Sequence, residues 1–182
     1  MNHAYLGLGS NLGDRAGYLR AALNLLVSSS DVEIEAVSSL YETAPLEIAE
    51  QPAFLNAVAA VRTQLAPRSL LRVVKETERA VGRIERVRFG PREVDVDILL
   101  YGALLLVSND LTIPHPRLAA RAFALVPLAE LAPGLVLPGT AVSIASLIPG
   151  ARAVGAVTLV QGPEWSGSKW NVSDFTRHAS PS

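Results

Sequence analysis

The 182-residue chain contains no cysteine and only one methionine. Disulfide bonds, thiolate metal sites and a cysteine nucleophile are therefore excluded. An excess of charge of either sign is also missing, because 16 basic residues face 17 acidic ones and the formal net charge is −1. Proteins that bind nucleic acid or anionic membranes over a whole face carry a marked positive charge. We therefore expect neither partner, and look for function in a local site.

Long hydrophobic runs are missing as well. A membrane-spanning helix needs about 18 or more consecutive apolar residues, and no such run occurs. The N-terminus, MNHAYLGLGSNLGDR, lacks the basic stretch and apolar core of a secretory leader. These features predict a cytoplasmic protein, which we expect to be a monomer, and the chain length fits one domain.

The order of the expected secondary-structure elements indicates the fold. Alternating apolar residues predict four strands, and apolar residues at helical spacing predict two helices. In chain order these elements cover residues 4–9 (strand), 14–26 (helix), 32–36 (strand), 54–63 (strand), 67–82 (helix) and about 94–100 (strand). The order βαββαβ predicts an α+β, ferredoxin-like fold, in which helices cover one face of an antiparallel sheet.

Extra C-terminal elements should follow this core. A helical stretch is expected around residues 118–131. From residue 161 onward the sequence is polar and rich in serine and glycine. We therefore expect one domain over residues 1–160 and a weakly ordered tail over residues 161–182. The alternative is that Trp165 and Trp170 dock on the body of the domain.

Two aspartates interrupt the apolar run GPREVDVDILLYG at residues 90–102. Since strand side chains alternate between faces, Asp95 and Asp97 share one face, roughly 6.5 Å apart along the strand. Buried carboxylates need arginine, lysine or a divalent cation beside them. Hard oxygen ligands that face a phosphate-bearing substrate suit Mg²⁺. The alternative for an isolated D-x-D triplet is a half-exposed strand with solvated carboxylates.

Basic residues flank this acidic strand. The segment GRIERVRFGPR at residues 82–92 places four arginines directly before the aspartates, and arginine forks match phosphate oxygens. His115 lies between two prolines in TIPHPR, close to Arg121, which suits either a phosphate contact or an exposed loop histidine. Glu78, on the second expected helix, is interpreted as a solvated surface acid.

An aromatic and an amide share one face of the strand expected over residues 54–63. Phe54 and Asn56 could hold a flat heterocycle by stacking and hydrogen bonding. The alternative is an ordinary strand face with Phe54 in the core. The glycines of GLGSNLGDR lack the spacing of a Rossmann fingerprint, and no P-loop motif occurs.

Six sequence blocks occur in one order between residues 4 and about 140. They are GSNLGD at 9–14, YETAP at 41–45, QPAFLNAV at 51–58, GR at 82–83, RFGPREVDVDILLYG at 88–102 and IPHPRL at 113–118. Together they resemble the 6-hydroxymethyl-7,8-dihydropterin pyrophosphokinase family. The resemblance implies a ferredoxin-like fold and transfer of pyrophosphate from ATP to the pterin hydroxymethyl group, with release of AMP, in folate biosynthesis.

The resemblance also implies roles for individual residues. Asp95 and Asp97 would bind two Mg²⁺ ions and would form the catalytic group together with Arg83 and Arg92. Basic side chains would contact the nucleotide, namely Lys75, Arg83, Arg88, Arg92, His115 and Arg121. The pterin would lie between Phe54 and Phe123, in a pocket completed by Thr43, Pro45, Leu46, Asn56 and Phe89.

The chain departs from many family members at four positions. Phe89 replaces tryptophan and Phe54 replaces tyrosine, which preserves stacking. Lys75 replaces glutamine and Pro116 replaces tyrosine, which affects the expected nucleotide contacts.

Two other functions fit the same element order. A two-metal nucleotidyl transferase or cyclase on a ferredoxin-like palm would also use paired acids, but would release pyrophosphate instead of AMP. An RNA-recognition sheet would need an aromatic-rich signature and a basic surface, which the sequence lacks.

Overall fold

The computed structural model describes residues 1–45, 50–84, 86, 90–153, 155–167 and 170. Its main feature is a six-stranded antiparallel sheet in the order β5-β1-β4-β3-β8, with β2 also paired to β4. The strands are β1 (Asn2–Ser10), β2 (Val32–Val37), β3 (Leu40–Thr43), β4 (Phe54–Thr63), β5 (Asp95–Tyr101) and β8 (Thr158–Gln161). A small hairpin is formed by β6 (Leu106–Val107) and β7 (Thr112–Ile113).

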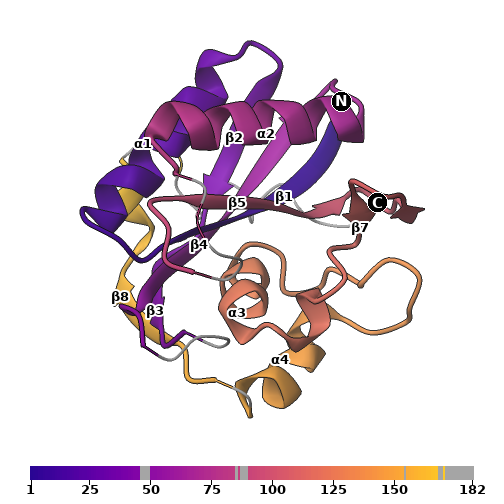
Figure 1. Cartoon of the computed structure of the whole chain (residues 1–182). Coiled ribbons are helices and arrows are strands. Elements are labelled where there is room, and N and C mark those ends of the chain that lie inside the picture. The colour runs from indigo at the N-terminus through magenta and orange to yellow at the C-terminus, as the bar shows by residue number, and fades with distance from the viewer. Residues whose placement is uncertain (46–49, 85, 87–89, 154, 168–169, 171–182) are drawn as a thin grey trace.

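Helices cover both faces of the sheet (Figure 1). The helices are α1 (Arg15–Ser28), α2 (Pro67–Val81), α3 (Ala122–Leu131) and α4 (Ile144–Arg152), with 3₁₀ turns η1 (Leu118–Ala120) and η2 (Pro163–Ser166). The ferredoxin-like fold expected from the sequence is confirmed: all elements of the βαββαβ order are present, with the short strand β3 inserted between β2 and β4, and α1 and α2 lie together on one face. The opposite face is covered by α3 and α4, which are among the additional C-terminal elements.

Local sequence explains where α2 begins and ends. Pro67 occupies the first turn, where its missing N–H has no intrahelical partner to lose. Gly82 ends the helix in the left-handed conformation with φ of 105°, and its N–H donates to the Arg79 carbonyl. This turn directs the chain back toward the sheet, where Arg83 contacts Asp95 at the start of β5.

Two apolar layers hold the helices to the sheet. On the α1/α2 face, Leu23 and Leu70 pack in one buried cluster with strand residues such as Val96. On the other face, Leu125 of α3 packs in a second cluster with Val58 of β4 and with β5. The sequence of β4, FLNAVAAVRT, is apolar on both faces because both faces are covered.

The first residues of the C-terminal segment that was expected to be weakly ordered from residue 161 adopt a defined structure. Residues 158–161 form β8, which pairs with β3, and the following η2 turn buries Trp165 at 3% exposure. The indole Nε1 of Trp165 donates to the Ser38 carbonyl over 2.8 Å. Burial of one aromatic side chain therefore holds this segment against the domain, although its composition is polar. Residues 171–182 lie outside the described residues.

Among the residues that the structure describes, no helix is both long and apolar enough to cross a membrane.

Candidate active site

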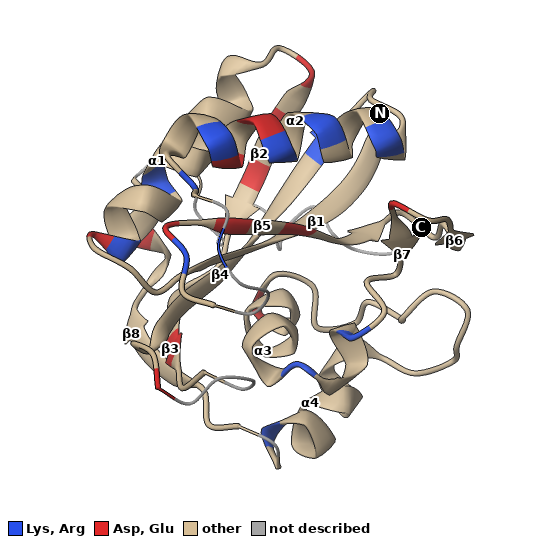
Figure 2. Ribbon diagram, in the orientation of Figure 1, with Lys and Arg blue, Asp and Glu red and all other residues tan. Residues whose placement is uncertain are grey.

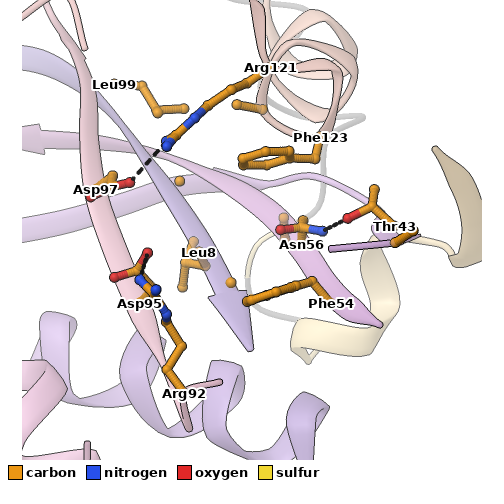
Figure 3. Close-up of a pocket in the computed structure, with 15 residues that line it drawn as sticks. Leu8, Thr43, Phe54, Asn56, Arg92, Asp95, Asp97, Leu99, Arg121 and Phe123 are labelled. Carbon is orange, nitrogen blue, oxygen red and sulfur yellow. Dashed lines mark hydrogen bonds and ion pairs between the residues drawn. The ribbon is translucent and has the colours of Figure 1, made fainter. Parts of the chain in front are cut away.

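A pocket that is open to solvent lies between the sheet and the start of α3. Figure 3 shows its two ends: an aromatic end around Phe54 and Phe123, and an acidic end at Asp95 and Asp97. The strands β4, β1 and β5 form its floor, so one pocket joins two chemically different surfaces.

Glycines in β1 keep the floor open between these ends. Gly9 pairs with Asn56 of β4 on one side and with Asp95 of β5 on the other. A Cβ atom at Gly9 would lie 3.4 Å from the Asn56 Oδ1 atom. Because adjacent strands are about 4.8 Å apart, Asn56 and Asp95 lie roughly 10 Å apart on either side of β1. Gly9, which lies between them, contributes no side chain to this space. Gly7 continues this open floor beside Asp97.

The aromatic end is built from three elements. Phe54 begins β4, Phe123 lies in the first turn of α3, and Thr43 ends β3 opposite Phe54. Asn56 is 5% exposed, and its Nδ2 donates to the Thr43 Oγ1 over 2.9 Å. This hydrogen bond fixes the amide, with its edge toward the space between the two rings (Figure 3). The guanidinium of Arg121 lies 5.3 Å from the centroid of the Phe123 ring.

At the acidic end, each aspartate contacts cationic or imidazole side chains. Asp95 accepts from Arg83 Nη1 over 2.6 Å and from Arg92 Nη1 over 3.0 Å. Asp97 lies 3.6 Å from Arg121 Nη1 and 3.8 Å from His115 Nε2. Arginine, one of the partners expected beside these carboxylates, therefore lies near both of them, and Figure 2 shows acidic positions on β5 with basic positions on the segment before it.

The two aspartates differ in electrostatic character. Burial alone would raise the pKa of Asp95, but Arg92 and Arg83 outweigh it and hold the pKa below its ordinary value. Burial and then the charge of Asp95 raise the pKa of Asp97. Burial lowers the pKa of His115, against the attraction of Asp97. The site thus holds one firmly ionised carboxylate beside one that is poorly compensated without further cations.

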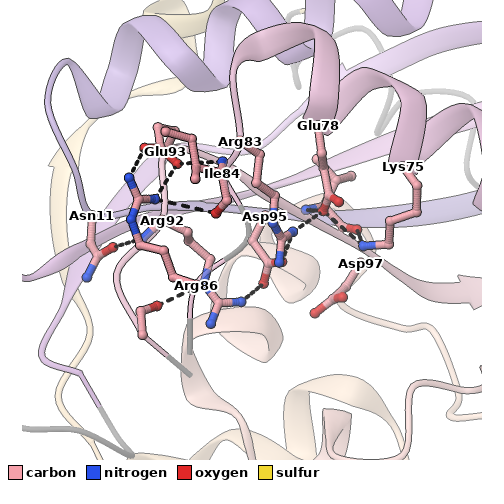
Figure 4. Close-up of polar contacts among 12 residues, drawn as sticks. Asn11, Lys75, Glu78, Arg83, Ile84, Arg86, Arg92, Glu93, Asp95 and Asp97 are labelled. Atoms are coloured by element: carbon pink, nitrogen blue, oxygen red, sulfur yellow. Dashed lines mark hydrogen bonds and ion pairs between the residues drawn. The ribbon is translucent and has the colours of Figure 1, made fainter. Parts of the chain in front are cut away.

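Two more acids, Glu93 and Glu78, lie near the aspartates (Figure 4), and neither is among the described residues that line the pocket. Both terminal nitrogens of Arg86 donate hydrogen bonds to the Glu93 carboxylate, over 2.8 and 2.7 Å, and these bonds lower the pKa of Glu93 to about 2. Lys75 Nζ lies 2.9 Å from a carboxylate oxygen of Glu78. Glu78 is 3% exposed, so its interpretation as a solvated surface acid is wrong.

The structure brings most of the site residues expected from the sequence together. Those that line the pocket are Thr43, Phe54, Asn56, Arg92, Asp95, Asp97, Arg121 and Phe123. Arg83 and His115 reach it through their contacts with the aspartates. Pro45 lines a neighbouring cavity beyond Phe123, and Lys75 lies on the α2 side of β5. Leu46, Arg88 and Phe89 lie outside the described residues.

Sequence reasoning missed several residues of this site. Gly7 and Gly9 were placed in the strand expected over residues 4–9 but were given no role in the site, although their period-two spacing within a strand signals an open sheet face. Leu99, two residues beyond Asp97, continues the pocket face of β5. Within the described part of the chain, no cluster of three or more His, Asp or Glu side chains forms a complete metal cage.

Comparison with known proteins gives one consistent result. Residues 5–133 match the family described as 7,8-dihydro-6-hydroxymethylpterin-pyrophosphokinase. A Methylorubrum extorquens protein named 2-amino-4-hydroxy-6-hydroxymethyldihydropteridine pyrophosphokinase is 43% identical over 151 residues, which are 82% of this chain and 96% of that protein. A Bacillus subtilis protein of the same name is 45% identical over 130 residues, 71% of this chain and 78% of its own.

Solved structures support the fold. The Plasmodium falciparum HPPK-DHPS wild-type crystal structure matches with a TM-score of 0.65 and 17% identity. The match covers 81% of this chain and 44% of that chain.

Proposed function

Because the chain belongs to the 7,8-dihydro-6-hydroxymethylpterin-pyrophosphokinase family, we propose that the pocket between Phe123 and the aspartates is its active site. The chain transfers pyrophosphate from ATP to the hydroxymethyl group of 6-hydroxymethyl-7,8-dihydropterin in folate synthesis. The observation that carries the assignment of the site is its continuity: a flat aromatic slot opens directly onto a pair of carboxylates surrounded by arginines.

The pterin would occupy the aromatic end. Phe54 and Phe123 would stack on its two faces, each contributing about 1–3 kcal/mol on the scale measured for bases on aromatic side chains. The remaining donor and the acceptor of the Asn56 amide would read the edge of the ring. Because Thr43 already accepts one Asn56 hydrogen, the amide cannot rotate freely, which favours a single pterin orientation.

Asp95 and Asp97 would hold two Mg²⁺ ions. The donor set fits this metal, since Mg²⁺ commonly takes one or two protein carboxylates and completes its shell with substrate phosphates and water. When bound, the ions would neutralise and orient the triphosphate. The poorly compensated charge of Asp97 supports the same assignment, because an added cation would relieve it.

The basic residues would hold the nucleotide. Arg83 and Arg92 compensate Asp95 in this structure, and both guanidiniums are close enough to the pocket to contact phosphate oxygens. Arg121 and His115 would contact them from the Asp97 side. Lys75 would add positive charge from the far side of β5, and Arg88 is assigned to the same nucleotide group on the family resemblance alone.

Catalysis would consist of positioning and electrostatic stabilisation. The pterin hydroxyl oxygen forms a bond to the β-phosphorus of ATP, and the bond from that phosphorus to the oxygen shared with the α-phosphate breaks. AMP leaves with the shared oxygen, and the hydroxyl proton is released to solvent. No side chain of the protein becomes covalently attached.

Product analysis tests this function. The protein is incubated with ATP, Mg²⁺ and 6-hydroxymethyl-7,8-dihydropterin, and the products are separated by anion-exchange chromatography. We expect AMP and the pterin diphosphate in equal amounts, and almost none with Asp97→Ala, since one oriented charge of this kind contributes about 10²–10³ in rate. Release of pyrophosphate with a nucleotidylated product would instead indicate the nucleotidyl transferase alternative.

A further inference from the structure

Glu78 is a buried carboxylate to which the reaction described above gives no role. It continues the buried stripe of α2, four residues after Val74 and eight after Leu70. An ionised carboxylate in such a position needs several strong hydrogen bonds to offset its lost hydration. One oxygen of Glu78, Oε1, accepts three of them: from the Val96 N–H over 2.7 Å, from Arg83 Nη1 over 2.6 Å and from Lys75 Nζ over 2.9 Å.

The first of these bonds fixes the backbone between the two aspartates. In the described sheet, β5 pairs with β1 and forms an edge. The N–H of Val96 donates to Glu78, and the carbonyl of Val96 lies 3.4 Å from Lys75 Nζ. The Lys75–Glu78 pair therefore takes the place of a neighbouring strand at the residue that separates Asp95 from Asp97. A shift or rotation of β5 at this point would move both carboxylates in the pocket.

The second bond holds an arginine at the acidic end. The same Arg83 Nη1 atom lies 2.6 Å from Glu78 and 2.6 Å from Asp95 (Figure 4). If Asp95 bound a metal ion in place of this arginine, Glu78 would still offer Arg83 a carboxylate. Arg83 would then stay beside the phosphates and would not turn to solvent.

We propose that Glu78 is a positioning residue for pyrophosphoryl transfer, which orients the Asp95–Asp97 section of β5 and retains Arg83 beside it. The inference rests on the metal and nucleotide roles given under Proposed function. Glu78 is absent from the described pocket lining, so it acts through Val96 and Arg83 without touching substrate. The competing explanation is that Glu78 only satisfies the edge of the sheet, in which case its loss affects stability alone.

Two variants separate these explanations. Glu78→Gln keeps an oxygen that can accept from Val96 but removes the charge that holds Arg83. The double variant Lys75→Gln, Glu78→Gln also removes the lysine that would otherwise lose its partner, and its new amide can still donate to the Val96 carbonyl. Glu93→Gln is the matched control, because Glu93 is another buried carboxylate held by an arginine, Arg86, and it makes no described contact with Asp95 or Asp97.

The decisive measurement is calorimetric titration with a non-hydrolysable ATP analogue at several Mg²⁺ concentrations, alongside titration with pterin and thermal unfolding in EDTA. We expect Glu78→Gln and the double variant to weaken metal-dependent nucleotide binding about 10- to 100-fold, as for other residues that orient metal ligands. Pterin affinity should change by less than about twofold, since the aromatic end is distant. Glu93→Gln should lower the thermal midpoint and leave nucleotide binding close to that of the wild type.

Lower stability with unchanged metal-dependent binding in both Glu78 variants would overturn the inference, and so would failure of both to fold. Asp97→Ala serves to separate this failure from that of the proposed site. If Asp97→Ala binds the metal and nucleotide like the wild type, the site assignment is wrong. If it loses binding while Glu78→Gln retains it, only the role of Glu78 is wrong.

Discussion

Replacing the two neighbouring aspartates by asparagine should affect the stability of the metal-free protein unequally, with a loss at Asp95 and either no loss or a small gain at Asp97. The side chains share one face of β5 and differ by one carboxylate oxygen from their replacements, so shape is nearly conserved. What differs is the compensation of charge: Asp95 contacts Arg83 and Arg92 at 2.6 and 3.0 Å, whereas Asp97 has ion-pair contacts of 3.6 and 3.8 Å.

Asp95→Asn should be destabilising. The amide retains an acceptor but loses the charge that strengthens two hydrogen bonds, and bonds to charged groups contribute about 1.5–3 kcal/mol each. We expect a net loss of about 2 kcal/mol because asparagine keeps part of the interaction. For a chain of this length that corresponds to a fall in Tm of roughly 4–8 °C. Since the folded pKa of Asp95 lies below its ordinary value of 3.8, this contribution is present at neutral pH and is lost as the pH falls through the lowered pKa.

Asp97→Asn should leave the metal-free protein equally stable or slightly more stable. Like charges about 6.5 Å apart repel by about 2.5 kcal/mol at an effective dielectric constant of 20. The side chain of Asp97 is 34% exposed, which screens the repulsion, and loss of the Arg121 contact offsets more of it. The net gain is at most about 1 kcal/mol. Because the folded pKa of Asp97 is raised above 3.8, folding favours its protonated form, and the advantage of asparagine should appear as the pH rises through the raised pKa.

The assay is thermal unfolding by circular dichroism in EDTA, between pH 4 and pH 8. At pH 8 His115 is neutral, because burial lowers its pKa from 6.5. Adding Mg²⁺ with an ATP analogue should then stabilise the wild type and neither variant. Equal destabilisation by the two substitutions at pH 8 would refute the assignment of unequal charge compensation.

Three further outcomes are expected. Phe123→Ala should weaken pterin binding about tenfold or more and leave nucleotide binding unchanged in calorimetric titrations, whereas equal losses for both ligands would mean that the ring only supports the fold. Asn56→Ala should weaken pterin binding by about 1–3 kcal/mol, since polar groups of the ligand lose their buried partner, and a purely structural role would appear as a lower Tm with normal affinity. Trp165→Ala should lower the Tm by roughly 10 °C, because a buried aromatic side chain is lost. The kcat of the folded protein should stay unchanged at low temperature. An unaltered Tm would show that burial of Trp165 contributes no stability.

The sequence predicted those helices and strands whose apolar residues recur with a helical or strand period. Strand β4 was expected at its observed limits, Phe54–Thr63, because apolar residues and flanking turn signals coincide there. Strand β3, with only four residues, carries too short a pattern to recognise, and it forms because the start of β4 offers it a partner. The segment around Trp165 looked polar by composition, and its anchoring depends on long-range contacts: burial of the indole in the core and its hydrogen bond to the Ser38 carbonyl.

The candidate site was predictable to the extent that its residues belong to sequence blocks. Asp95 and Asp97 could be placed on one face from strand geometry alone, and the residues proposed to bind pterin were named from the family resemblance. Glu78 was misjudged because a carboxylate on an amphipathic helix is far more often exposed than buried. Its partners, Arg83 and the Val96 amide, come from a later part of the chain and meet it only after α2 packs against β5.

The contacts of Trp165 limit where the chain can be truncated or fused to another domain. The family match ends at residue 133, but a chain cut there would lack β8 and the indole that caps the Ser38 carbonyl. Strand β3, which carries Thr43 at its end, would become an unpaired edge strand, and such strands tend to pair with strands of other molecules. A transplantable catalytic unit therefore extends at least to Gly167, and a partner domain is better joined beyond that residue than at the end of the recognisable family sequence.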